Sequence, residues 1–134
     1  MQLREGRNNG INFESDYLSN IAIKYDGQEE LEMRFASEEK KDWCEVTLDW
    51  IEEIKSFTEL VRRVCVEGER DVKIYPDDFR GLMLRCINKE KETELQFLKN
   101  FQAVRVVMNR EHGDIFWDNV RNLLQEPGKK EINY

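Results

Sequence analysis

The sequence predicts an α+β fold in which a mostly antiparallel sheet of about six or seven strands packs against two amphipathic helices. The evidence is a change in the spacing of apolar residues. Every second residue is apolar over residues 44–50, and the apolar residues then recur every three or four positions up to Gly68. A similar change follows after residue 103. Alternation is typical of a half-buried strand and the longer spacing of an amphipathic helix, so the expected order is strands, helix, strands, helix.

The first part of the chain predicts a flexible end followed by a hairpin. Residues 1–12 are polar and include an Asn-Asn-Gly turn signal, so we expect them to be loose. Apolar residues alternate over 21–25 and again over 31–35, and Asp26-Gly27 between them favours a tight turn. The charged stretch 37–42 is a connector or, alternatively, a short helical turn capped by Ser37.

The central stretch predicts a strand that runs directly into a helix. Cys44, Val46, Leu48 and Trp50 share one phase and are expected in the core, while Trp43 has the opposite phase. The helix then extends from Ile51 until a glycine ends it.

The second half predicts more strands and a second helix. Val72 and Ile74 indicate a short strand that ends at Pro76-Asp77, and alternation predicts further strands over 82–87, 94–98 and 103–108. His112-Gly113-Asp114 is interpreted as a loop whose last residue caps a helix that ends before Pro127. The closing residues 126–134 are expected to be flexible.

Length and cysteine usage predict one cytoplasmic domain. The 134 residues suffice for a single core, so we expect one domain over residues 1–134. The first 20 residues contain no apolar run typical of a signal peptide, and no stretch is long and apolar enough for a membrane span. All three cysteines fall on apolar phases, which predicts buried free thiols in a reducing compartment.

The net charge of −7 is concentrated in one part of the chain. Residues 26–69 carry 14 acidic and 6 basic side chains, whereas the other 90 residues carry 15 basic and 14 acidic ones. Such a negative field repels nucleic acids and anionic membranes and attracts a basic protein. The alternative interpretation is a solvated polar surface that only keeps the protein in solution.

The sequence contains no pattern that predicts catalysis, a cofactor or a metal. His112 is the only histidine, which excludes most metal sites and histidine-dependent nucleophiles, and alone in a loop it is interpreted as a surface residue. No glycine-rich phosphate loop or calcium-binding loop is present. Basic and aromatic residues do not cluster as they do in nucleic-acid-binding surfaces.

These observations favour a stoichiometric inhibitor that blocks a basic toxin or nucleic-acid-handling effector through an acidic surface. In size, acidity and lack of a catalytic set, the chain resembles small bacterial immunity proteins and phage-encoded inhibitors. The expected contact residues are six acids and one aromatic anchor: Glu32, Trp43, Glu45, Asp49, Glu52, Glu53 and Glu59. The alternative for Trp43 is ordinary packing against the fold.

Two other functions stay open. The first is a small-molecule-binding or enzymatic domain with a pocket between the sheet and the helices, where Tyr25, Tyr75, Arg85 and Arg105 would orient a ligand. The second is a structural subunit of a larger assembly, in which the uneven charge serves pairing.

Overall fold

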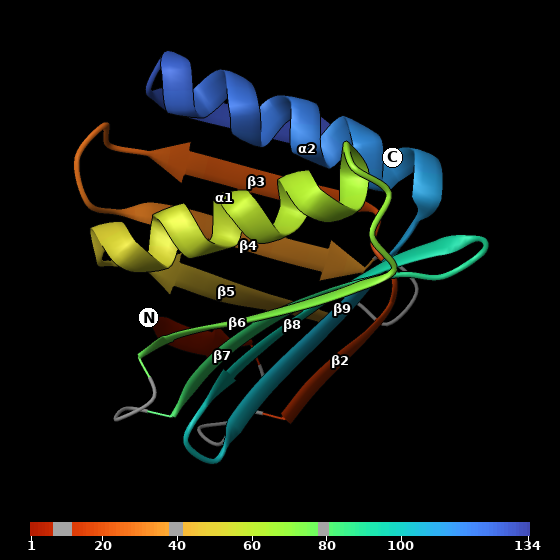
Figure 1. The fold of residues 1–134 in the computed structure, drawn as a ribbon, viewed down its shortest axis with the longest axis horizontal. Helices are drawn as coiled ribbons and strands as arrows, with labels where there is room; N and C mark the ends of the chain where they lie inside the picture. The colour runs from red at the N-terminus through yellow and green to blue at the C-terminus, as the bar shows by residue number, and fades with distance from the viewer. Residues whose placement is uncertain (7–11, 38–41, 78–80) are drawn as a thin grey trace.

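The protein has an α+β fold with two helices and two five-stranded sheets, and the computed structural model describes residues 1–6, 12–37, 42–77 and 81–134 (Figure 1). Sheet A has the strand order β1-β5-β4-β3-β10, and sheet B has the order β2-β9-β8-β7-β6. All neighbouring strands are antiparallel except β2 and β9.

The elements follow the chain in the order strands, helix, strands, helix, with one further strand at the end. Their bounds are β1 (Gln2–Glu5), β2 (Asn12–Tyr17), β3 (Asn20–Tyr25), β4 (Leu31–Ser37), β5 (Asp42–Leu48), α1 (Ile51–Cys65), β6 (Asp71–Asp77), β7 (Leu82–Asn88), β8 (Glu92–Lys99), β9 (Gln102–Asn109), α2 (Arg110–Gln125) and β10 (Gly128–Asn133). The predicted α+β fold class is confirmed, but the strands of the described residues number ten and form two sheets rather than one.

The two ends of the chain, expected to be flexible, both contain strands. β1 pairs with β5, and β10 pairs with β3, so each forms an edge of sheet A. Both are mostly polar because an edge strand is held by backbone hydrogen bonds on one side and buries few side chains. Apolar alternation therefore gives no signal for them. The predicted connector over 37–42 and the predicted turn at Pro76-Asp77-Asp78 fall partly outside the described residues.

Two predictions about the helix starts are wrong. Helix α2 begins at Arg110, not after a loop at Asp114, because the side chain of Asn109 caps it by accepting a hydrogen bond from the backbone N–H of Glu111. Gly113 lies inside its first turn, where a Cβ would meet the Thr93 hydroxyl at 2.6 Å, so glycine permits close packing on β8. Trp50 is 43% exposed rather than buried, because β5 ends at Leu48 and Trp50 is the N-cap residue of α1.

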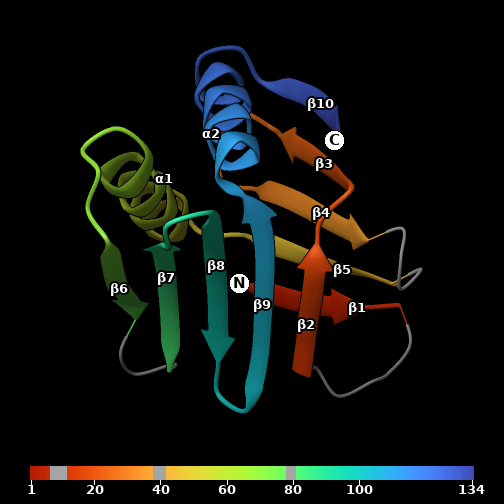
Figure 2. The ribbon, with the colours of Figure 1, turned by 90° about the vertical axis from the view of Figure 1, so that its right-hand side faces the viewer.

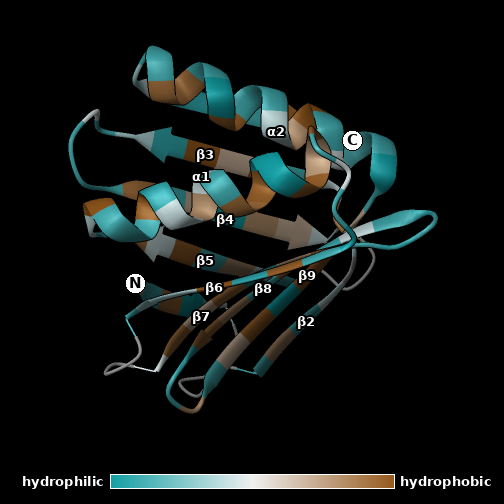
Figure 3. Cartoon of the chain, viewed as in Figure 1, coloured by the Kyte–Doolittle hydropathy of each residue, from teal (hydrophilic) through white to brown (hydrophobic). Residues whose placement is uncertain are grey.

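The core lies between the two sheets and the two helices. Hydrophobic and hydrophilic residues alternate along both helices (Figure 3), as expected for helices with one buried side. Phe35 of β4, Phe57 of α1, Phe97 of β8 and Phe116 of α2 meet with ring centroids 5.8 to 6.2 Å apart. Each comes from a different sheet or helix, so this aromatic cluster joins all four parts of the fold.

The chain passes back and forth between the two sheets. β2 follows β1 of sheet A but joins sheet B, while β10, the last strand, returns to sheet A. Figure 2 shows the strands of sheet B in front of those of sheet A, with both helices at one end. Each sheet thus has an inner face toward the core and an open face that no helix covers.

Candidate functional site

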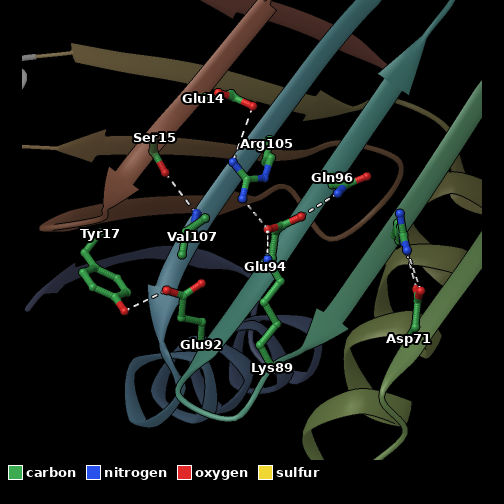
Figure 4. Close-up of polar contacts among 11 residues, drawn as sticks. Glu14, Ser15, Tyr17, Asp71, Lys89, Glu92, Glu94, Gln96, Arg105 and Val107 are labelled. Carbon is green, nitrogen blue, oxygen red and sulfur yellow. Dashed lines mark hydrogen bonds and ion pairs between the residues drawn. The ribbon is translucent and has the colours of Figure 1, made fainter.

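A buried carboxylate lies at the centre of the open face of sheet B (Figure 4). Glu94 of β8 points away from the core, yet its side chain is only 2% exposed. Arg105 of β9 approaches it at 2.8 Å, Lys89 of the β7–β8 hairpin donates to it at 3.0 Å, and Gln96 donates to its second oxygen. The strand alternation places Glu94 and Gln96 on the same face, and the β8–β9 register brings Arg105 opposite Gln96.

Hydrogen bonds within the cluster compensate for the burial of the Glu94 carboxylate. Burial alone would raise the pKa of Glu94, but hydrogen bonds from Arg105, Gln96 and Lys89 outweigh it and lower the pKa to about 2. The hydrogen bond to Glu94 raises the pKa of Arg105. Glu94 is therefore ionised at neutral pH and holds Arg105 in a fixed position, rather than acting as a proton donor.

Two further polar pairs fix side chains on either side of this cluster. The hydroxyl of Tyr17 on β2 donates to Glu92 at 2.9 Å, which raises the pKa of the tyrosine. Arg85 of β7 donates to both carboxylate oxygens of Asp71 on β6. Such bidentate geometry orients the guanidinium group and limits its rotation.

The other end of the same face is apolar. Leu98 lies between Met83 and Ala103 in the strand register and is 36% exposed. Phe101, in the β8–β9 turn, is fully exposed. Beside them lies a hollow of about 490 Å³, whose walls include Met83, Leu98, Ala103, Gln96 and Arg105. Together with Tyr17 of β2 and Tyr75 of β6, Leu98 and Phe101 make up half of the large exposed apolar side chains of the described chain.

Three of the seven predicted contact residues come together on the other sheet. Glu32, Trp43 and Glu45 all lie on the open face of sheet A. Glu45 is opposite both Arg34 and Arg4, and the guanidinium carbons of these arginines lie 4.4 and 5.4 Å from the centre of the Trp43 ring. Trp43 is thus packed against arginines by cation–π contacts rather than left as a bare apolar anchor.

Two more predicted residues have a structural role near the start of the chain. The Met1 ammonium group donates to Asp49 and Glu53, at 2.7 Å in each case. The Glu53 side chain is only 3% exposed, and the backbone N–H of Asp49 also donates to it. Burial raises the pKa of Asp49, but the hydrogen bond and charge of the ammonium outweigh it and lower the pKa overall. Glu53 in particular is not available to a partner.

The last two predicted residues lie on the exposed side of α1. Glu52 is 3.9 Å from Lys55, and Glu59 receives two hydrogen bonds from Arg62. The seven predicted residues therefore lie in three places, and most of their charges are paired within the chain. They do not form one continuous acidic surface.

The pocket expected between the sheets and the helices is filled by the four phenylalanines of the core. Of the four residues proposed for it, Arg85 and Arg105 lie instead on the open face of sheet B. Tyr75 lies in the irregular stretch of β6 between Ile74 and Asp77, whereas Tyr25 of β3 packs partly buried against the core. Alternation along a strand does not indicate which of its two faces points outward, because that depends on the sheet to which the strand belongs.

The side chains that could act as a nucleophile or a general base, the three cysteines and His112, pack against other groups of the fold. The three cysteines are free thiols; burial raises the pKa of Cys44 and Cys86 and raises that of Cys65 to about 11. The ring of His112 stacks on Tyr134 with centroids 3.8 Å apart. Within the described residues, no three potential ligands gather as a metal site. Neither helix in that part of the chain is long and apolar enough to cross a bilayer.

Sequence reasoning did not find the Glu94 cluster, although two signals were present. Glu94 and Gln96 alternate with Leu95 and Phe97, which indicates a strand with a polar side. Phe101 directly follows the turn residues Lys99-Asn100, an unusual position for a large apolar side chain.

In comparisons with known proteins, the chain matches no protein-family model, no curated protein and no solved structure.

Proposed function

We propose that this chain is a non-catalytic protein-binding domain of the stoichiometric-inhibitor type, and that its partner contacts the open face of sheet B. The observation that carries the proposal is the exposure of Tyr17, Tyr75, Leu98 and Phe101 on or beside one sheet face. Protein interfaces are enriched in aromatic residues and arginine, and a few such side chains supply most of the binding energy.

The preformed polar contacts of this face support the same proposal. Arg105 is held by Glu94, Arg85 by Asp71 and Tyr17 by Glu92. Side chains that are already fixed lose little conformational entropy when a partner binds. The hollow beside Leu98 offers room for an apolar side chain of the partner, with Arg105 and Gln96 at its wall.

The chemistry of the ionisable groups favours binding over catalysis. A general acid or base needs a pKa near the working pH, whereas the pKa of Glu94 is about 2. A nucleophilic cysteine needs a lowered pKa, whereas burial raises the pKa of all three thiols. These free thiols also fit a reducing compartment, so we place the interaction in the cytoplasm.

The net charge supports a basic partner. A charge of −7 attracts a basic protein at long range, even though the contact face itself carries charges of both signs. A domain of this kind inhibits its partner when the covered surface is the one with which the partner works.

The test compares two double variants as bait in affinity purification from the source cells. Tyr75→Ser with Phe101→Ser removes two exposed side chains of β6 and of the β8–β9 turn, and Val66→Ser with Ile115→Ser removes two exposed side chains of the helical elements. We expect a basic protein to bind the wild type and the helix-side control, and to bind the sheet variant at least about tenfold more weakly. Equal capture by both variants would contradict the proposal.

Inhibition is tested on the captured partner. We expect its activity to fall in proportion to added wild-type chain and to reach its minimum at about one chain per partner molecule, as tight binding requires. Full activity of the partner in the saturated complex would leave binding intact and refute inhibition. Binding of a metabolite in the hollow, detected as thermal stabilisation, would favour the small-molecule alternative instead.

A further inference from the structure

A second hollow, of about 460 Å³, lies where three connections of the chain meet beside the start of α2. Figures 1 and 2 show the α1–β6 connection, the β7–β8 hairpin and the first turn of α2 close together. The residues that line it are Gly68, Arg70, Asn88, Lys89, Glu90 and Arg110. Three are cationic and one is anionic, so the hollow is basic in a protein that is acidic overall.

Two of these cations have neither an acidic nor an aromatic partner within the described residues. Arg70 and Arg110 form no ion pair there, although carboxylates are abundant. Of the other described arginines, Arg34 packs on the Trp43 ring, and the rest pair with acids: Arg4, Arg62, Arg63, Arg85, Arg105 and Arg121. Glu90 lines the same hollow without pairing with either arginine among these residues. Like charges that share a hollow repel each other, and a bound anion would remove that cost.

The surrounding backbone fixes the positions of both arginines. The N–H of Asn88 donates to the carbonyl of Arg70 at 2.8 Å, and the N–H of Arg110 donates to the carbonyl of Lys91 at 3.2 Å. In the orientation that satisfies its amide, Asn88 also accepts a hydrogen bond from the Arg110 guanidinium at 3.2 Å. The two guanidinium groups thus come from separate elements that are tied to the same hairpin.

We infer that this hollow binds the phosphoryl group of a small anion, either inorganic phosphate or a phosphomonoester. Arginine pairs with phosphate oxygens through two parallel hydrogen bonds, and two arginines match a dianion. The volume fits a small ligand. Nucleic acids and anionic membranes are disfavoured because the net charge of −7 repels an extended anionic surface. The site is separate from the open face of sheet B, so the inference does not depend on the proposed partner.

The experiment is an NMR titration of the ¹⁵N-labelled protein at constant ionic strength, with inorganic phosphate in one arm and O-phosphoserine in the other. We expect saturable shifts of the amides of Arg70, Lys89 and Arg110. Arg70→Gln with Arg110→Gln should weaken binding by about tenfold or more, because two charge-assisted hydrogen-bonding groups are lost. Arg121→Gln, on the same helix but paired with Asp118, is the matched control and should bind like the wild type.

The two arms identify the source of the phosphoryl group. Tighter binding of O-phosphoserine assigns the site to phosphomonoesters, and equal binding assigns it to inorganic phosphate. Shifts that grow linearly without saturation, or equal affinity in the double variant, would overturn the inference. Both arginines are exposed, so the variants should fold, and each single variant repeats the test.

Discussion

The open faces of the two sheets differ in what they leave exposed. On sheet A, charges of opposite sign alternate across the strands from Arg4 to Glu45 to Arg34, and the one tryptophan packs against the two arginines. On sheet B, the ion pairs occupy the centre, and apolar side chains such as Tyr75 and Phe101 remain accessible. Charge counted along the sequence therefore points to the acids of sheet A and α1, while accessible apolar area points to sheet B. In proteins generally, exposed apolar patches mark interaction sites more often than paired surface charges do.

The largest expected loss of stability comes from a substitution in the core that the two sheets share. Phe97→Ala removes the β8 member of the aromatic cluster and should lower the free energy of unfolding by about 3 to 5 kcal/mol. Because Phe97 contacts rings from both β4 and α1, we expect the two sheets to unfold in one transition. Chemical denaturation followed by tryptophan fluorescence and by far-ultraviolet circular dichroism checks this. Separate midpoints for the two signals would show that the sheets are independent.

A smaller effect is expected at the acids of the first half. Glu53→Gln leaves the Met1 ammonium with only Asp49 as its anionic partner and should cost about 2 kcal/mol. Glu52→Gln, the adjacent residue, removes only an exposed pair with Lys55 and should cost less than about 0.5 kcal/mol. Urea denaturation of both variants separates a structural acid from a surface one. Equal stability of the two variants would contradict the assignment.

The two sheets can be compared directly through one carboxylate on each open face, Glu94 on sheet B and Glu45 on sheet A. Glu94→Gln leaves Arg105 and Lys89 without their shared carboxylate and should cost about 1 to 2 kcal/mol at neutral pH. Glu45→Gln, which faces the exposed Arg4 at 3.4 Å, should cost less than about 1 kcal/mol. Denaturation of both variants under the same conditions measures the difference, and a larger loss in Glu45→Gln would reverse the assignment.

The pH dependence gives a second measure of the Glu94 cluster. The pKa of Glu94 falls from 4.5 to about 2 in the folded protein, so its contribution to stability is complete above 4.5 and is lost as the pH falls toward 2. The stability gap between the wild type and Glu94→Gln should narrow over that range. A gap that stays constant from pH 6 to pH 2 would show that the carboxylate charge contributes nothing.

The smallest effect on stability is expected at the exposed turn. Phe101→Ser alters a side chain that is fully exposed and should change the free energy of unfolding by less than about 0.5 kcal/mol. Its melting temperature should match that of the wild type, while capture of the partner falls. A clear loss of stability would mean that Phe101 packs against the fold and is not a free contact residue.

The sequence predicts the elements with strong apolar periodicity and misses those without it. Strands β3, β4, β5, β7 and β9 and helix α1 lie close to their predicted positions because each buries one regular side. β1 and β10 depend on backbone pairing with distant strands, which leaves no local pattern. The same reason explains the division into two sheets: alternation gives a strand its faces but not its neighbours.

The Glu94 cluster could not be predicted from the sequence for a related reason. A buried glutamate such as Glu94 is indistinguishable along the chain from an exposed one, because its burial comes from Arg105 and Lys89 on neighbouring segments. The predicted acids belong to the segment with the highest density of negative charge, and their partners again come from distant segments: Arg4 for Glu45 and Met1 for Glu53.

The interlacing of the sheets has a consequence for synthesis. Because β2 enters sheet B early and β10 closes sheet A last, sheet B is complete only after β9 has been synthesised, and sheet A only after β10 has been synthesised. Until then β3 has an unpaired edge, which is a hazard for intermolecular pairing. The long sequence separations also favour slow folding. Expression at reduced temperature or with chaperones should therefore raise the yield, and a chain ending before residue 128 should aggregate.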